Sequence, residues 1–230
     1  MWLKDSSIGR KLIMSISGLF LVLFLTFHLA MNFAAVFSAD AYNAICEFLG
    51  ANWYALVGTL VLVAGFLVHI VYAFILTLQN RKARGNDRYA VTARPKGVEW
   101  ASQNMLVLGI IVVLGLVLHA WQFWAKMQLV ELQHMAGMDV DTSLVTNGVY
   151  YIQQVFSNPV YLVLYLVWFA AIWFHLTHGF WSAIHTIGWN NLVWMNRWKT
   201  ISNVFSTIIC LGFAFIAIWF FIQSNCSCVG

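Results

Sequence analysis

Long uninterrupted apolar stretches alternate with short polar segments along the whole chain. Five stretches carry no Asp, Glu, Lys or Arg: residues 12–39, 48–80, 100–125, 142–196 and 200–230. Each is longer than the ~20 residues that cross a bilayer as an α-helix, and far longer than the ~9–11 residues of a membrane-spanning strand. The pattern therefore predicts an all-α integral membrane protein.

Breaks in the apolar pattern set the limits of the predicted helices. Asn147-Gly148 and Ser157-Asn158-Pro159 interrupt the longest stretch, and Pro159 suits the first turn of a helix. Residues 126–158 are therefore expected to form mostly an interfacial loop, and the chain a single membrane domain. The five helices are expected at about residues 12–37, 53–79, 101–125, 159–187 and 201–223.

Composition excludes several other classes of protein. Hydrophobic residues make up 62% of the 230 residues and charged residues only 9%, against roughly 25% charged residues in a soluble domain. The 12 Lys and Arg are too few and too scattered to form a nucleic-acid surface. The first apolar stretch is too long for a secretory signal peptide and contains His28 and Asn32, so we expect it to be retained as a span. The four cysteines form neither a disulfide framework nor a metal-binding array.

The positions of the basic residues predict how the chain crosses the membrane. If the chain crosses the membrane five times, the segment before the first span, the segment between the second and third spans and the segment between the fourth and fifth spans lie on the same side. These three segments hold every basic residue except Lys126. The positive-inside rule then predicts a cytoplasmic N-terminus and a C-terminus outside. The basic residues on the predicted cytoplasmic side are Lys4, Arg10, Lys11, Arg81, Lys82, Arg84, Arg88, Arg94, Lys96, Arg197 and Lys199.

Four predicted spans each contain a histidine, a costly residue in a bilayer and therefore a candidate for function. His28 and His119 lie about 16 and 18 residues from the cytoplasmic starts of their helices, or ~24 and ~27 Å. His69 and His175 each lie about 16 residues from the outer starts of helices that run the other way. We therefore expect two level pairs of histidines, offset by on the order of 15 Å.

Such pairs suit haem. Two imidazoles that face each other across a helical bundle can ligate iron from both sides, so two pairs predict two haems. With both axial positions filled by protein, electron transfer is the expected role. Gly65, Gly115 and Gly179 lie about one turn from histidines and could leave room for porphyrin, although small residues also let transmembrane helices pack closely. A zinc or copper site is disfavoured because no thiolate or carboxylate lies at matching depth.

Short motifs surround these histidines. The first helix and its continuation carry Ser17-Gly18, Phe27-His28-Leu29, Asn32 and Ala41-Tyr42-Asn43. The other helices carry Val68-His69-Ile70-Val71-Tyr72, Leu118-His119-Ala120-Trp121, Phe174-His175 and Gly179-Phe180-Trp181. Together, over nearly the whole chain, these motifs resemble the single-chain, five-helix, di-haem cytochrome b subunit of bacterial succinate dehydrogenases and fumarate reductases.

The resemblance implies a role for each histidine. His28 and His119 would ligate the haem b distal from the cytoplasm, and His69 and His175 the proximal haem b. His178 is the alternative ligand in the fourth helix. His175 is favoured because it has the family's spacing to Gly179 and Trp181.

The resemblance also implies partners and a location in the bacterial cytoplasmic membrane. A flavoprotein subunit with the succinate and fumarate site and an iron–sulfur subunit would dock on the cytoplasmic face. This chain has neither a GxGxxG motif after a strand nor a cysteine array, so by itself it is not expected to act on succinate. The exchangeable substrate would be a membrane quinone, commonly menaquinone. Glu47 is the candidate for quinone proton transfer, or else a loop carboxylate exposed to water.

Two other functions stay open. A di-haem cytochrome b could instead serve a hydrogenase or a formate dehydrogenase. A haem-free transporter or channel could use the histidines as a proton relay. Against the transporter, the sequence shows no inverted repeat and no pattern of broken helices, which many transporter folds contain.

Overall fold

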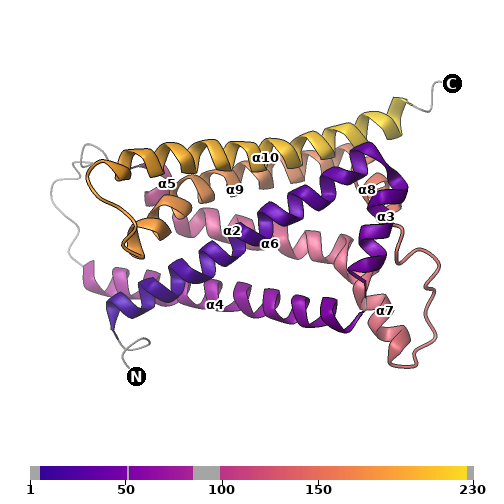
Figure 1. Cartoon of the computed structure of the whole chain (residues 1–230), viewed down its shortest axis with the longest axis horizontal. Helices are drawn as coiled ribbons and strands as arrows, with labels where there is room; N and C mark the ends of the chain where they lie inside the picture. Colours follow the sequence, from indigo (N-terminus) through magenta and orange to yellow (C-terminus); the bar gives the residue numbers. More distant parts are fainter. Residues whose placement is uncertain (1–5, 51, 85–98, 227–230) are drawn as a thin grey trace.

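The computed structural model describes residues 6–50, 52–84 and 99–226 and shows an all-α bundle (Figure 1). Within these residues five helices are long and apolar enough to cross a membrane, which confirms the predicted class and the five spans. They are α2 (Ser7–Phe37), α4 (Trp53–Arg84), α6 (Met105–Gln122) with its continuation η1 (Trp124–Lys126), α9 (Pro159–Thr186) and α10 (Trp194–Cys226). The chain is thus a multi-pass membrane protein.

Successive spans run in alternating directions, so the described chain starts at one end of the bundle and finishes at the other (Figure 1). We call these the N-terminal end and the C-terminal end. The start of α2, the end of α4 and the start of α10 share the N-terminal end, with Arg10, Lys11, Arg81, Lys82, Arg197 and Lys199. Lys4, Arg88, Arg94 and Lys96 lie outside the described residues.

Within the described residues, four short helices lie between the spans. α3 (Ala39–Phe48), α7 (Gln128–Met135) and α8 (Gly148–Phe156) lie at the C-terminal end. α5 (Trp100–Gln103) comes directly before α6 and is separated from it by a break at Asn104. The expectation that residues 126–158 form mostly a loop is therefore wrong, because α7 and α8 occupy much of that segment.

α8 shows why the sequence pattern misled. Asn147 stands at its N-cap, where the side chain accepts a hydrogen bond from the backbone of Tyr150 at 3.1 Å, so this residue begins a helix rather than interrupting one. Ile152, Val155 and Phe156 then recur at helical spacing and are buried. The segment is a short amphipathic helix packed against α10, α3 and α9.

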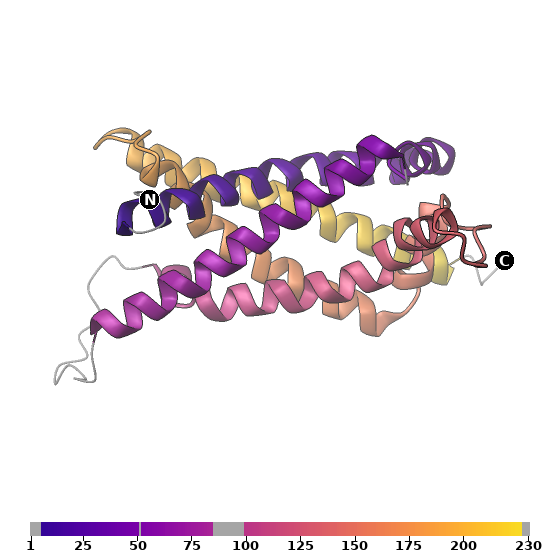
Figure 2. The ribbon, with the colours of Figure 1, turned by 90° about the horizontal axis from the view of Figure 1, so that it is seen from below.

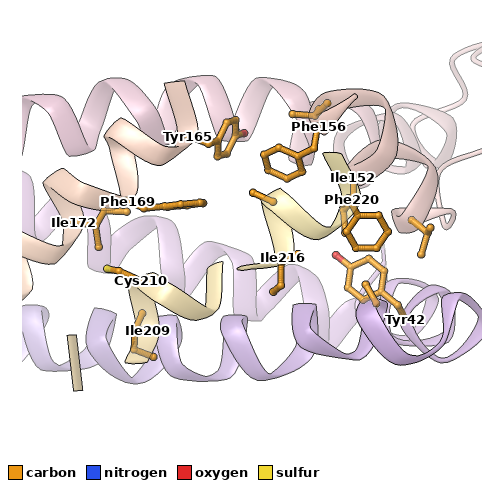
Figure 3. Close-up of a cluster of buried hydrophobic side chains, with 14 of the residues drawn as sticks. Tyr42, Ile152, Phe156, Tyr165, Phe169, Ile172, Ile209, Cys210, Ile216 and Phe220 are labelled. Atoms are coloured by element: carbon orange, nitrogen blue, oxygen red, sulfur yellow. The ribbon is translucent and has the colours of Figure 1, made fainter. Parts of the chain in front are cut away.

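The main core lies between α9, α10, α8, α3 and the end of α2 (Figure 3). Ile152 and Phe220 are each only 2% exposed. Towards the N-terminal end, small residues let α9 and α10 approach closely. The hydroxyl of the fully buried Ser202 on α10 donates to the carbonyl oxygens of Leu176 and Thr177 on α9, at 3.1 and 3.0 Å. These contacts fix α9, the helix that carries His175, against α10.

α4 stands at the edge of the bundle and packs mainly on α2. Figure 2 shows it crossing the other helices diagonally. None of the residues in the most apolar stretch of α4 is buried inside the bundle, whereas 33% of the residues in the corresponding stretch of α10 are buried. α4 is therefore attached to the bundle largely through α2.

Candidate functional site

Four histidines, one from each of α2, α4, α6 and α9, meet in two pairs, as their predicted depths required. The rings of His28 on α2 and His119 on α6 have centroids 5.7 Å apart and planes at 88°. The rings of His69 on α4 and His175 on α9 have centroids 6.3 Å apart and planes at 67°. The predicted pairing is confirmed, while the ligation of haem stays a prediction.

The ring separations suit two ligands of one metal ion. A bond from a metal to an imidazole nitrogen is about 2.0–2.1 Å long, so two rings on opposite sides of one ion have centroids on the order of 6 Å apart. Both pairs fall close to this separation. Among the described residues no group of three or more His, Cys, Asp and Glu side chains gathers around a common point. Within the described residues, each pair therefore offers two imidazoles and no further His, Cys, Asp or Glu ligand.

His69 is held by a hydrogen bond that favours metal binding. The Ser17 hydroxyl on α2 donates to the carbonyl oxygen of Met14 at 3.0 Å, and its oxygen lies 3.2 Å from Nδ1 of His69. Since the hydroxyl proton is directed at Met14, the Ser17 oxygen accepts from an Nδ1–H group. The Nε2 atom of His69 is then left with its lone pair, the form in which histidine binds a metal.

His28 has a different partner. The Asn32 side-chain amide nitrogen donates to the His28 carbonyl oxygen at 2.7 Å and lies 3.3 Å from Nδ1 of His28. The Asn32 side-chain oxygen accepts from the Tyr42 hydroxyl at 2.8 Å. Ser17, Asn32 and Tyr42 belong to the motifs noted in the sequence, but their contacts join residues whose approach the sequence pattern did not show.

The other two histidines lack such partners within the part of the chain that the structure describes. Nδ1 of His119 and Nδ1 of His175 are buried without a hydrogen-bond partner. Buried polar atoms are normally hydrogen-bonded, and the exceptions often mark functional sites. Each histidine pair thus contains one ring whose Nδ1 atom has a hydrogen-bonding side chain beside it and one ring whose Nδ1 atom has no such partner among the described residues.

Glycines near the histidines do not all have the expected role. A Cβ on Gly18 would lie 3.2 Å from Cε1 of His69, so this glycine lets the ring approach α2 closely. At Gly115 a Cβ would collide with the Trp168 ring, and at Gly65 it would lie 2.5 Å from Cε1 of Phe20. These two glycines make room for aromatic side chains, whereas Gly179 has open space within 4 Å.

Aromatic rings surround the His28–His119 pair. Phe24 stacks on His28 with centroids 5.3 Å apart, and Phe213 lies 5.7 Å from it. Trp168 lies 5.7 Å from the His119 ring, and its indole N–H donates to the carbonyl oxygen of Val112 at 3.0 Å. The pair is therefore enclosed by flat apolar surfaces, with one polar chain through Asn32.

His178, the alternative ligand, faces another partner. Its Nδ1 lies 3.2 Å from Oε2 of Glu99, whose other oxygen accepts from Lys199 Nζ at 3.0 Å. The Trp181 indole N–H also donates to Oε2, at 3.3 Å. Burial would raise the pKa of the Glu99 carboxyl, but the hydrogen bonds and charges of His178 and Lys199 outweigh it and lower that pKa. We call Glu99, His178, Trp181 and Lys199 the Glu99 cluster.

Glu99 was not singled out by the sequence reasoning. It stands 79 residues before His178 and just ahead of α5, and only the folded chain brings the two together. A single carboxylate beside an apolar span was the available signal, but the sequence did not show which side chain it would meet.

Glu47, the candidate for quinone proton transfer, lies in α3 at the C-terminal end with an exposed side chain. A role for it in quinone chemistry stays a prediction.

Near this end, a hollow of about 280 Å³ is lined by Glu131, His134, Met135 and residues 142, 145 and 146. A second hollow, of about 360 Å³, lies at the turn between α9 and α10.

Comparisons with known proteins do not place the chain in a family. No protein-family model, curated protein or solved structure matches it.

Proposed function

We propose that the chain is the membrane-anchoring, di-haem cytochrome b subunit of a succinate dehydrogenase or fumarate reductase complex. The observation that carries the proposal is that four intramembrane histidines, from four different spans, form two pairs. The ring centroids within the pairs are 5.7 and 6.3 Å apart. Four ionisable side chains in a bilayer would otherwise be a large cost. The motifs around these histidines supply the choice of family.

The His69–His175 pair has the features of a ligand set. Ser17 holds His69 in the tautomer that leaves Nε2 free, and Nδ1 of His175 is buried without a partner among the described residues. When bound, each haem would supply a one-electron centre, and because two histidines would hold it, no site for substrate would be left on the iron. The protein's part is to hold the two rings of each pair at this separation and to exclude water.

The His28–His119 pair needs local rearrangement to hold a porphyrin. Phe24, Trp168 and Phe213 now lie against the two rings. To hold haem there, these side chains would have to move aside and would then pack against it. Aromatic side chains suit that position because their flat apolar faces can pack against a flat apolar ring system.

Orientation and partners follow from the distribution of charge. The basic N-terminal end would face the cytoplasm of a bacterium, where the iron–sulfur subunit and the flavoprotein subunit would dock. The C-terminal end, with Glu47, would face outward. A membrane quinone, commonly menaquinone in such complexes, would exchange electrons with the haems, and Glu47 would transfer its protons.

The decisive experiment is a dithionite-reduced minus oxidised optical spectrum of the purified full-length chain, with haem measured per chain. The proposal requires two b haems per chain. A chain that carries no haem contradicts the proposal and leaves the histidine proton relay as the better explanation. Subunits that co-purify with the haem-containing chain separate a succinate dehydrogenase or fumarate reductase from a hydrogenase or formate dehydrogenase.

A further inference from the structure

A chain of hydrogen bonds runs from His28 to α3 at the C-terminal end of the bundle. The Tyr42 hydroxyl donates to the side-chain oxygen of Asn32 at 2.8 Å, and the amide nitrogen of Asn32 faces Nδ1 of His28 at 3.3 Å. Tyr42 is 9% exposed and lies in the same buried cluster as Phe220 (Figure 3). Its hydroxyl is also within hydrogen-bond reach of the Cys46 thiol.

In this arrangement the hydrogen bonds run towards His28. Since the Asn32 oxygen is taken by Tyr42, Asn32 presents its amide nitrogen, a donor, to Nδ1 of His28. A neutral ring that accepts at Nδ1 carries its proton on Nε2. That proton blocks the nitrogen that would bind iron, which is the opposite of the situation at His69.

Every member of the chain can reverse its direction. The imidazole can move its proton to Nδ1, the Asn32 amide can turn over about its last torsion, the Tyr42 hydroxyl can rotate, and the Cys46 sulfur is a weak acceptor. After reversal, Nδ1–H of His28 donates to the Asn32 oxygen, the amide nitrogen donates to Tyr42, and Tyr42 donates to Cys46. The His28 carbonyl oxygen loses its bond from the Asn32 side chain, and the Asn32 oxygen must also move away from it, because two acceptors at the present 2.7 Å would repel each other.

We propose that Asn32 and Tyr42 are positioning residues for the haem of the His28–His119 pair: their hydrogen-bond chain reverses when Nε2 of His28 binds iron, and it thereby sets the reduction potential of that haem. The inference rests on the proposed function. A hydrogen bond accepted from Nδ1–H makes a histidine ligand more basic, which favours the oxidised metal and lowers the potential. The bond at Ser17 has the same effect on the other haem.

The test is a redox titration of haem absorbance in the full-length chain, with haem counted per chain. The absorbance of each haem is first assigned from His28→Ala and His69→Ala. In Asn32→Asp a carboxylate replaces the amide as acceptor. Since a charged acceptor forms the stronger hydrogen bond, we expect the ratio of reduced to oxidised haem at a fixed potential to fall about tenfold at the His28–His119 pair. This corresponds to about 59 mV for one electron.

Tyr42→Phe should act in the opposite direction. The Asn32 amide loses the oxygen to which it donates after reversal, its bond to Nδ1–H weakens, and the same ratio rises about three- to tenfold, the range of one neutral hydrogen bond. Tyr54→Phe is the matched control. The Tyr54 hydroxyl donates at 2.8 Å to the carbonyl oxygen of Phe48 in α3, so this substitution removes a similar hydrogen bond that has no link to a histidine. It should leave both potentials unchanged.

The outcomes separate this inference from the proposed function. If the wild-type chain carries two haems but neither Asn32→Asp nor Tyr42→Phe shifts the potential of the His28–His119 haem, the inference is wrong and the proposed function still stands. Equal shifts of both haems also overturn the inference, because they indicate a general change of the bundle. A wild-type chain without haem overturns both. If Tyr42→Phe does not fold, Asn32→Asp alone still decides through the sign of its shift.

Discussion

Gly18 on α2 lies against the edge of the His69 ring, so closely that a Cβ at this position would be 3.2 Å from Cε1 of His69 and 3.6 Å from Nδ1. The adjacent Ser17 holds the same ring through its hydroxyl oxygen. Two consecutive residues of α2 therefore fix where the His69 ring lies and which nitrogen carries its proton.

Gly18→Ala tests whether this close approach matters for cofactor binding. The added methyl group must push the His69 ring away from Ser17, so we expect the haem of the His69–His175 pair to fall below one per chain while the other is retained. Gly109→Ala is the matched control, because its Cβ would lie 3.9 Å from Cε1 of His175, an ordinary contact. Haem content and optical spectra of the two variants check this, and equal haem loss in both would contradict it.

Single alanine substitutions should remove the haems one pair at a time. We expect His28→Ala or His119→Ala to remove one haem, and His69→Ala or His175→Ala to remove the other, because a haem held by one axial histidine is bound more weakly. The exposed His185 of α9 serves as the control, since His185→Ala should keep both haems. Haem per chain, measured after purification, distinguishes these results from a general loss of folding.

His178→Ala should retain both haems. Its Nδ1 is directed at Glu99, whereas His175 is the histidine of α9 that faces His69. The same spectra of His178→Ala and His175→Ala make the comparison. Haem loss in His178→Ala, together with full retention in His175→Ala, would reverse the assignment of the ligand.

The Glu99 cluster should contribute a pH-dependent part of the stability. The pKa of Glu99 is lower in the folded chain than its ordinary value of 4.5, so the stabilisation is fully present above that value and is lost as the pH falls through the lowered pKa. Glu99 is 36% exposed, and half-exposed ion pairs contribute only up to about 1 kcal/mol. We therefore expect Glu99→Gln to lower the Tm at pH 7 by up to about 4 °C.

Thermal unfolding in detergent at several pH values checks this prediction. The difference in Tm between the wild-type chain and Glu99→Gln should shrink below pH 4.5, the ordinary pKa of the carboxyl. Asp139→Asn, at an exposed position in the loop after α7, should change the Tm little at any pH. A Tm difference that stays constant into the acid range would show that the charge of Glu99 is not its source.

The sequence predicted the features that depend on local pattern. Apolar run length located the five spans, and counting residues from their ends placed His28 level with His119 and His69 level with His175. This worked because a helix rises by a fixed amount per residue, so position along the chain gives depth directly.

Features that depend on the angle at which helices face one another were not predictable in this way. His175 and His178 are less than one turn apart, and only the packing of α9 decides that the first faces His69 and the second faces Glu99. The direction of the hydrogen bond at Asn32 depends on Tyr42 in a separate helix. The helix that Asn147 caps was missed because asparagine also occurs where helices end.

The peripheral position of α4 bears on the biogenesis of the protein. His175 belongs to a helix fixed on several sides, whereas His69 reaches it on a helix that docks mainly through α2. Until α4 docks on α2, the His175 ring lacks the facing ring of His69, so the proposed pair of ligands is incomplete. We therefore expect the haem proposed for this pair to bind only once α4 has docked, so that the haem of the His69–His175 pair is the more sensitive of the two to changes at the contact between α2 and α4.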